Sequence, residues 1–365
     1  MGFKCGIVGL PNVGKSTLFN ALTKTAAAQA ANYPFCTIEP NTGDVAVPDP
    51  RLGRIAEIAK SAQIVPTRIT FVDIAGLVRG ASKGEGLGNQ FLANIRETDA
   101  VAHVVRCFED DDVTHVEGGV DPVRDAEIID TELMLADLES LEKRVVNIEK
   151  RATAKDKEAL AVLPLMKGAL NLLRDGKPAR MLEVDPADAK LFGSLQLITA
   201  KPVLYVANVD EESAAEGNDH SRAVETMAAE QGAGCVTISA AIEAEIAQLP
   251  IEEQAEFLEM NGLAEAGLDR LIRAGYDLLA LQTYFTAGPK ETRAWTVRRG
   301  SKAPQAAGVI HTDFERGFIR AQTIAYDDYV GLGGEVAAKE AGKARDEGKE
   351  YVVRDGDVLL FKFAT

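Results

Sequence analysis

The sequence lacks any apolar run that approaches the ~20 residues of a membrane-spanning helix, which argues against an integral membrane protein. A strand-like pattern begins almost at the first residue and leaves no room for a signal peptide. Together these absences predict a cytoplasmic protein with no membrane partner.

Cysteine and histidine are scarce, with four residues of each in 365. The cysteines are Cys5, Cys36, Cys107 and Cys235. They form no C-x-x-C pair, which argues against a zinc site. Cys5 and Cys107 lie in apolar strand patterns and are expected in the core. Cys36 lies in a predicted loop and is the one candidate for a redox-sensitive thiol, although the sequence does not define its role.

An excess of positive charge is also lacking, because the net charge is −16. This argues against binding of polyanions by the whole surface, and no specific DNA partner is predicted. Residues 201–280 hold 4 basic and 16 acidic residues, whereas residues 281–365 hold 13 basic and 12 acidic ones. Any nucleic-acid contact should therefore favour the C-terminal part, although each arginine taken singly is better explained as solvated surface. The basic cluster there comprises Arg293, Arg298, Arg299 and Lys302.

A complete G-x-x-x-x-G-K-[ST] pattern runs from Gly9 to Ser16, between an apolar run and a helical pattern. In that context the loop amides and the helix N-terminus are expected to bind phosphate. Lys15 would reach the β- and γ-phosphates as the catalytic cation, and the Ser16 hydroxyl would ligate Mg²⁺. The alternative is a glycine-rich turn with a chance lysine. The predicted nucleotide-binding residues here are Asn12, Val13, Gly14, Lys15, Ser16 and Thr17.

A second motif, Asp-x-x-Gly, ends an apolar strand pattern at Asp73 and Gly76. Asp73 would hold Mg²⁺ through a water molecule, and the Gly76 N–H would sense the γ-phosphate. Between the two motifs, Thr37 lies where a switch-segment threonine completes the Mg²⁺ shell. Taken alone, Thr37 would be an ordinary loop threonine.

The base-recognition motif departs from the guanine-specific N-K-x-D pattern. Asn208 follows another buried-strand pattern, but Val209 replaces the lysine and Glu211 replaces the aspartate. Both changes weaken a guanine clamp. Asn208, the Val209 backbone and Ser239, in a loop similar to the S-A-K loop of G domains, are the predicted base contacts.

These segments together resemble the YchF / Obg-like ATPase family of translation-factor-related P-loop NTPases. The resemblance rests on G-L-P-N-V-G-K-S-T, N-Y-P-F-C-T-I-E-P-N, D-I-A-G-L-V-R-G-A-S-K-G-E-G-L-G-N-Q-F-L, N-V-D-E and Gln282–Gly288, and it covers essentially the whole chain. It implies an ATPase with weaker GTPase activity, Mg²⁺ as cofactor, and ribosomes or ribosomal subunits as partners.

Leu77 stands where Ras-like switches place a water-positioning glutamine. Intrinsic hydrolysis is therefore expected to be slow, with charge stabilised by another group. The resemblance implies that Asn12 helps to hold K⁺ near the phosphates. The equal alternative is that Asn12 only forms hydrogen bonds within its loop.

The length predicts two or three domains, and the fold class is α/β. Residues 1–123 and 201–280 are predicted to form a P-loop NTPase domain with a parallel-type sheet. Residues 124–200 would insert an antiparallel helical hairpin of the coiled-coil kind, with its second helix at Lys157 to Arg174. Residues 281–365 contain short strand patterns, among them Tyr351–Val353, and resemble a TGS-type β-grasp domain. Further helices are expected at Ile251 to Met260 and Leu268 to Leu281.

These observations favour a slow, ATP-preferring switch on ribosomes. Two alternatives stay open: a binding module whose output is nucleotide-gated partner binding, and a GTPase of the Obg type. Ribosome-stimulated turnover would distinguish the first, and competition between ATP and GTP the second. The sequence identifies neither the signal nor the oligomeric state.

Overall fold

The computed structural model describes residues 3–30, 41–74, 87–110, 115 and 118–364, which fold into two compact units. Each unit is built on its own six-stranded sheet. Within the described residues, no helix is long and apolar enough to cross a membrane.

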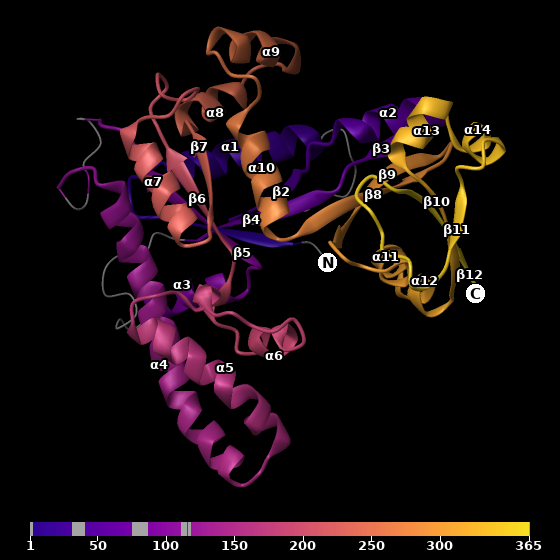
Figure 1. The fold of residues 1–365 in the computed structure, drawn as a ribbon. Helices are drawn as coiled ribbons and strands as arrows, with labels where there is room; N and C mark the ends of the chain where they lie inside the picture. Colours follow the sequence, from indigo (N-terminus) through magenta and orange to yellow (C-terminus); the bar gives the residue numbers. More distant parts are fainter. Residues whose placement is uncertain (1–2, 31–40, 75–86, 111–114, 116–117, 365) are drawn as a thin grey trace. The chain divides into compact units, whose positions relative to one another are not determined.

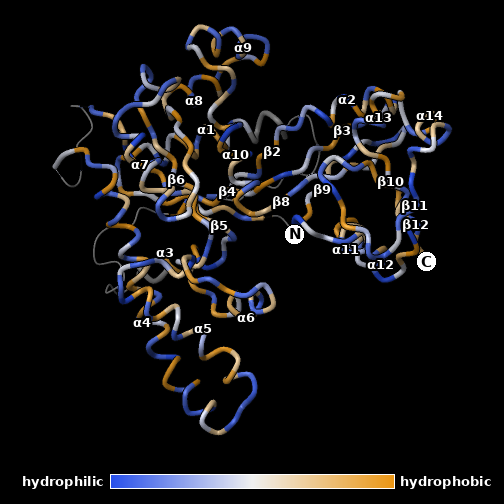
Figure 2. Tube along the Cα trace, in the orientation of Figure 1, coloured by the Kyte–Doolittle hydropathy of each residue, from blue (hydrophilic) through white to orange (hydrophobic). Residues whose placement is uncertain are grey.

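The first sheet has the strand order β2-β4-β1-β5-β6-β7, and the five strands from β4 to β7 are parallel (Figure 1). Every residue of β5 and β6 is buried, and Figure 2 shows both strands as largely hydrophobic. Burial on both faces is typical of a parallel sheet covered by helices, so the predicted α/β fold is confirmed. The strands are β1 (Lys4–Val8), β2 (Thr42–Ala46), β4 (Arg68–Asp73), β5 (Ala100–Arg106), β6 (Val203–Asn208) and β7 (Gly234–Ile238).

The register of the parallel strands brings their carboxyl ends to one edge of the sheet. Ile7 pairs with Asp73, Arg106 with Asn208, and Asn208 with Ile238. Ligands of open α/β sheets bind at this edge. The helices of this part are α1 (Lys15–Ala30), α3 (Leu87–Arg96), α7 (Asp219–Glu230), α8 (Ala240–Ile246), α9 (Ile251–Met260) and α10 (Gly267–Leu278), and the last two match the prediction within about three residues.

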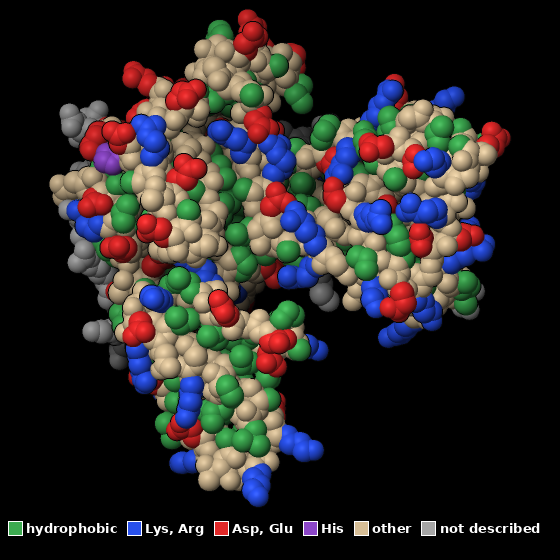
Figure 3. Space-filling model, viewed as in Figure 1, with side chains coloured by type: hydrophobic (Ala, Val, Ile, Leu, Met, Phe, Trp, Pro, Cys, Tyr) green, Lys and Arg blue, Asp and Glu red, His purple; other side chains and the backbone are tan. Residues whose placement is uncertain are grey.

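A helical hairpin projects from the first unit (Figure 1). It consists of α4 (Pro122–Thr153) and α5 (Lys157–Arg174), and the bounds of α5 match the prediction. Asp121 and Asp156 cap the two helices by accepting a hydrogen bond from a backbone N–H. The two helices share a hydrophobic core around Leu141, Met166 and Leu170. On the face of the hairpin that Figure 3 shows, basic side chains lie among hydrophobic ones.

The segment after the hairpin returns the chain to the first sheet through η1 (Ala179–Met181), α6 (Ala189–Gly193) and η2 (Ile198–Ala200). The buried Asp137 carboxylate accepts hydrogen bonds from the backbone N–H groups of Ile198 and Thr199, at 3.0 and 2.7 Å. It also accepts one from the Thr199 hydroxyl, at 2.6 Å. These three donors compensate for the cost of burying the carboxylate. The same bonds attach α4, at the base of the hairpin, to the segment that leads into β6.

The second sheet has the order β11-β10-β12-β8-β9-β3 and is covered on both faces. One face packs on α11 through Ala303, Ala306 and Ala307. The opposite face packs on α2, α13 and α14. The elements are α2 (Pro50–Ala59), β3 (Gln63–Val65), β8 (Leu281–Ala287), β9 (Glu291–Arg298), α11 (Ala303–Ile310), α12 (Thr312–Arg316), β10 (Phe318–Ile324), α13 (Tyr326–Leu332), α14 (Glu335–Glu340), β11 (Arg345–Glu347) and β12 (Val358–Phe363).

Two expectations for this unit need correction. Residues Val45–Ile69, which the sequence assigned to the nucleotide domain, belong to the second unit together with Tyr276–Thr365. The reason is that β3 pairs with β9 and that Leu52 and Ile55 of α2 pack in the core around Phe285. Tyr351–Val353, expected as a strand, forms only an isolated bridge between Val352 and Lys302.

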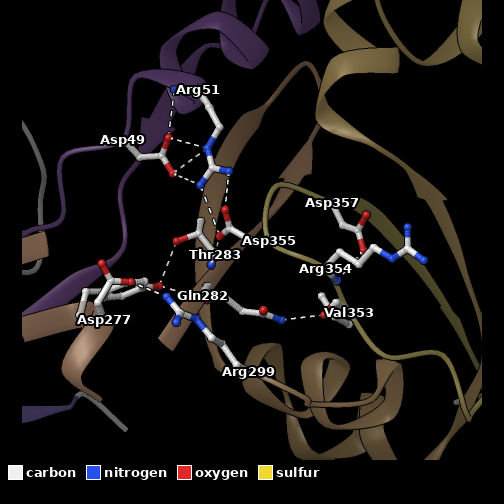
Figure 4. A network of polar contacts seen from close by, with 11 residues as sticks. Asp49, Arg51, Asp277, Gln282, Thr283, Arg299, Val353, Arg354, Asp355 and Asp357 are labelled. Carbon is white, nitrogen blue, oxygen red and sulfur yellow. Dashed lines mark hydrogen bonds and ion pairs between the residues drawn. The ribbon is translucent and has the colours of Figure 1, made fainter. Parts of the chain in front are cut away.

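A polar network around Arg51 links the early segment Val45–Ile69 to the C-terminal part of the second unit (Figure 4). The guanidinium contacts the carboxylates of Asp49 and Asp355, at 2.8 and 2.6 Å, and lies 5.4 Å from the centre of the Phe285 ring. Asp355 in turn accepts a hydrogen bond from the Thr283 N–H of β8 at 2.9 Å. The hydrogen bonds and ion pairs to Asp49 and Asp355 raise the pKa of Arg51 above its usual value despite partial burial. A helix from early in the chain is thereby bonded to the turn that precedes β12.

Candidate functional site

The glycine-rich loop joins β1, which ends at Val8, to α1, which begins at Lys15. Two of its glycines are required by close approach of neighbouring groups. A Cβ at Gly9 would lie 2.7 Å from the Val104 carbonyl oxygen. Gly14 has a φ of +89°, and a Cβ there would collide with the Asn208 side-chain nitrogen. The loop is therefore held tightly against β5 and β6, as a phosphate-binding turn must be.

Lys15 and Asp73 form an ion pair at this edge of the sheet. Both side chains are largely buried, and Asp73 ends the strand next to β1. The sequence assigned both residues to the phosphate and metal site, and the fold brings them together. Lys15 supplies a positive charge, and Asp73 supplies a carboxylate in contact with it.

The residues fit a magnesium ion of the P-loop kind. Ser16 is exposed in the first turn of α1, and Asp73 adds a carboxylate at the end of β4. Within the described residues there is no group of three or more His, Cys, Asp or Glu side chains that would form an all-protein cage. Mg²⁺ in nucleotide sites needs only one or two protein oxygens, because phosphate oxygens and water complete its shell.

Asn208 connects the phosphate loop to the loop after β7. Its Nδ2 donates a hydrogen bond to the Val13 carbonyl at 2.9 Å, and its Oδ1 accepts one from the Ala240 N–H at 2.9 Å. Both ends of the buried amide are thus engaged within the protein. Asn208 shapes the site by fixing two loops relative to each other, in addition to its predicted place beside the base.

A cavity of about 640 Å³ opens beside the phosphate loop. Its size suits a nucleotide base and sugar. The rim is acidic, with five carboxylates on two segments that follow β5 and β6. The lining residues are Asn12, Gly14, Thr17, Phe108, Glu109, Asp110, Asn208, Val209, Asp210, Glu211, Glu212, Ala240 and Ala241.

Of the predicted base contacts, Asn208 and Val209 line this cavity, whereas Ser239 does not. Val209 lines it, although the residue is only 2 % exposed and its N–H is bonded to the Ile238 carbonyl at 2.8 Å. Ser239 is also 2 % exposed, and its hydroxyl has no hydrogen-bond partner. Burial of a hydroxyl without a hydrogen-bond partner costs free energy. The Ser239 Oγ is therefore able to donate or accept a hydrogen bond next to the site.

Phe108, Glu109 and Asp110 form a wall of the cavity that was not predicted as part of the site from the sequence. This segment directly follows β5, at the same edge as Asn208. The signal that would have found it is an aromatic residue followed by carboxylates at the carboxyl end of a parallel strand.

Several predicted site residues lie outside the described part of the chain: Thr37, Gly76, Leu77 and Cys36. Of the other cysteines, Cys5 and Cys107 are fully buried, as expected. Burial raises the pKa of the Cys5 thiol to about 12 and raises that of Cys107 as well. Both thiols therefore stay protonated at neutral pH and act as core residues.

Comparison with known proteins gives concordant matches for both parts of the chain. A family model described as a 50S ribosome-binding GTPase matches residues 4–148, and the YchF GTPase C-terminal model, described as a protein of unknown function, matches residues 281–364.

Full-length relatives give the same result. The chain is 60% identical to the ribosome-binding ATPase YchF of Haemophilus influenzae and 54% identical to that of Bacillus subtilis, in each case over 100% of this chain and at least 99% of the relative. The solved structure of the Schizosaccharomyces pombe YchF GTPase superimposes with a TM-score of 0.89 at 39% identity, covering 99% of this chain and 98% of that one. The chain therefore belongs to the YchF family of P-loop NTPases.

Proposed function

We propose that this protein is a Mg²⁺-dependent ATPase that hydrolyses ATP slowly, uses GTP less well, and acts as a nucleotide-gated switch on ribosomes or ribosomal subunits. The observation that carries the proposal is the arrangement of Lys15, Asp73 and the acidic cavity along one edge of the first sheet. The relatives named ribosome-binding ATPases support the partner and the nucleotide.

Each residue of the site has a separate role in the proposed phosphoryl transfer. Lys15 and the amides of residues 12–17 would bind the phosphates and stabilise charge as it develops in the transition state. The Ser16 hydroxyl would ligate Mg²⁺, and Asp73 would hold it through water, with Thr37 completing the set. Bound Mg²⁺ would neutralise charge on the β- and γ-phosphates. Asn208 keeps the two loops in register while the base occupies the cavity.

The printed names of the relatives differ on the nucleotide, since two are called ATPases and the fission-yeast structure a GTPase. The cavity supports ATP. Val209 offers no cationic stem to cover a base, and Glu211 stands where a guanine clamp has aspartate. Direct competition of ATP and GTP for the purified protein tests this assignment, and preferential binding of GTP would contradict it.

Restoring the guanine clamp is expected to shift base preference. The double substitution Val209→Lys, Glu211→Asp should raise GTP affinity relative to ATP by ~1–3 kcal/mol, because a carboxylate would regain hydrogen bonds from the guanine base. Isothermal titration with both nucleotides measures the ratio. The matched control is Glu212→Asp, which shortens the neighbouring rim carboxylate and should leave the ratio unchanged. An unchanged ratio in the double variant would mean that base choice is set elsewhere in the cavity.

A potassium ion near the phosphates is expected to assist turnover, with Asn12 as its ligand. Asn12 has a φ of +63°, so Asn12→Gly removes the amide without adding backbone strain. Exchange of K⁺ for Na⁺ should slow ATP hydrolysis by the wild type, while Asn12→Gly should be insensitive to the exchange and still bind ATP. Steady-state turnover in matched salts measures this. Equal wild-type rates in both salts would restrict Asn12 to hydrogen bonding within its loop.

The switch function is tested by single-turnover hydrolysis with and without ribosomes. Acceleration by ribosomes is expected for a stimulated NTPase. Ribosome binding that depends on the bound nucleotide, without acceleration, would instead favour a binding module in which hydrolysis only resets the complex.

A further inference from the structure

Arg106 is the last residue of β5, and its side chain is the largest among the described residues that are fully buried, at 1 % exposure. It pairs in register with Asn208, so it lies at the sheet edge that carries the candidate site. Burial of a guanidinium is costly unless its donors are satisfied. A buried arginine at this position must therefore have acceptors for its N–H groups, and these acceptors indicate its role.

The guanidinium holds the segment that forms one wall of the cavity. Its Nε donates a hydrogen bond to the Phe108 carbonyl at 3.1 Å, and its Nη2 donates one to the Asp110 carbonyl at 3.2 Å. Its Cζ atom lies 4.6 Å from the centre of the Phe108 ring, within the range of a cation–π interaction. One side chain thus fixes both the backbone and the ring of this wall.

Other hydrogen bonds fix the start of the same segment. The Cys107 N–H donates to the Asn208 carbonyl at 2.8 Å, and the Asn218 amide donates to the Cys107 carbonyl at 2.7 Å. These bonds anchor Cys107 to β6 and α7. Phe108, Glu109 and Asp110 follow Cys107 along the cavity, and Arg106 binds the carbonyls of the first and the last of these three residues.

We propose that Arg106 is a positioning residue for base binding: it holds Phe108 and the backbone of Glu109 and Asp110 as a preformed wall against the nucleotide base. This inference rests on the proposed nucleotide site, and it adds a residue that does not touch the nucleotide. A preformed wall lowers the ordering cost of binding. Because the wall lies on the base side, Arg106 contributes to binding of a nucleotide and not to binding of phosphate alone.

The test compares a ligand with a base to a ligand without one. In full-length protein, Arg106→Met keeps an unbranched apolar side chain in place of the aliphatic stem and removes the hydrogen bonds and the charge. It is expected to weaken MgATP binding about tenfold, a loss that corresponds to one or two interactions of this kind. Affinity for inorganic tripolyphosphate with Mg²⁺ should stay within about twofold, since its contacts are confined to the phosphate loop. In turnover, KM for ATP should rise while kcat stays within about twofold, the pattern of lost uniform binding.

Two further variants keep the test decisive if Arg106→Met folds poorly. Arg106→Lys retains the charge but cannot reach both carbonyls as a fork, and it should show a smaller loss for ATP alone. Phe108→Ala should reproduce the ATP-specific loss, and adding Arg106→Lys to it should cause little further loss, because Arg106 acts through that wall. The control is Arg144→Met, which also removes a guanidinium bonded to a main-chain carbonyl (that of Leu195, 2.8 Å), but in the hairpin. It should leave both affinities unchanged.

Equal losses for ATP and tripolyphosphate, or additive losses in the double variant, would overturn the positioning role and leave Arg106 as a general structural residue. Failure of the nucleotide site itself would look different, because the wild-type protein would then bind neither ligand.

Discussion

Replacing Lys15 by alanine is expected to abolish ATP hydrolysis and to weaken ATP binding by at least about 100-fold, as befits loss of a charge-assisted contact to phosphate. The substitution removes the cation that the loop places at the β- and γ-phosphates. It also leaves the Asp73 carboxylate, now paired with Lys15, uncompensated where a polyanion must bind. Titration calorimetry and single-turnover hydrolysis measure the two effects.

A second lysine on the same helix provides the control. Lys24 is exposed on α1, away from the ion pair with Asp73. Lys24→Ala changes the net charge equally and should leave affinity and rate within about twofold, because exposed charges at a distance are screened. Hydrolysis at the wild-type rate by the Lys15 variant would show that the site is assigned wrongly.

Gly14→Ala is expected to have the second largest effect. Its backbone has a φ of +89°, and the new methyl group would collide with the Asn208 amide that bonds Val13 and Ala240. Strain and the broken bonds together should lower the free energy of unfolding by ~2–4 kcal/mol and ATP affinity by about tenfold or more. Thermal unfolding with and without MgATP measures both quantities.

Gly53 provides the control for the Gly14→Ala substitution. It lies inside α2, and a Cβ there would meet no heavy atom within 4 Å. Gly53→Ala should leave ATP affinity unchanged and stabilise the protein by up to ~1 kcal/mol through helix propensity. Similar unfolding curves for the two variants would mean that the phosphate loop relaxes around the methyl group without cost.

The parts of the fold that the sequence predicted correctly are those with strong local signals. The phosphate loop is marked by Gly9, Gly14 and Lys15 between a strand and a helix, and the structure places it there. The helix at Lys157–Arg174 was predicted correctly at both ends, because it follows a break in the helical pattern and stops before Gly176 and Pro178. In the structure Asp156 caps its start. Such features depend on neighbours in the sequence, so the sequence alone contains them.

The features that were missed depend on residues distant in the sequence. Nothing within Val45–Ile69 indicates that Gln63–Val65 will pair with Glu291–Arg293, more than 200 positions away. The helix α11 was also missed, since it has only eight residues and these include Pro304 and Gly308, the two poorest helix formers. Arg106 could have been noticed, because a charged residue inside the largely apolar run Val101–Phe108 must find partners when that strand is buried. Which partners it finds is a property of the folded loop.

The second unit is made of separate stretches of the chain: besides residues 28–30, it contains Val45–Ile69 and the chain from Tyr276 onward. Because the stretches of the two units alternate along the chain, neither unit can be separated from the other by a single cut in the sequence. A fragment that starts at the C-terminal strands would lack β3 along β9 and α2 over Phe285, leaving an open sheet edge and an uncovered apolar face. Gene fusion or truncation at a single point cannot transfer either unit whole. The two units are therefore expected to have been passed on as one indivisible piece, and any dissection into fragments would require circular permutation or co-expression of the missing segment.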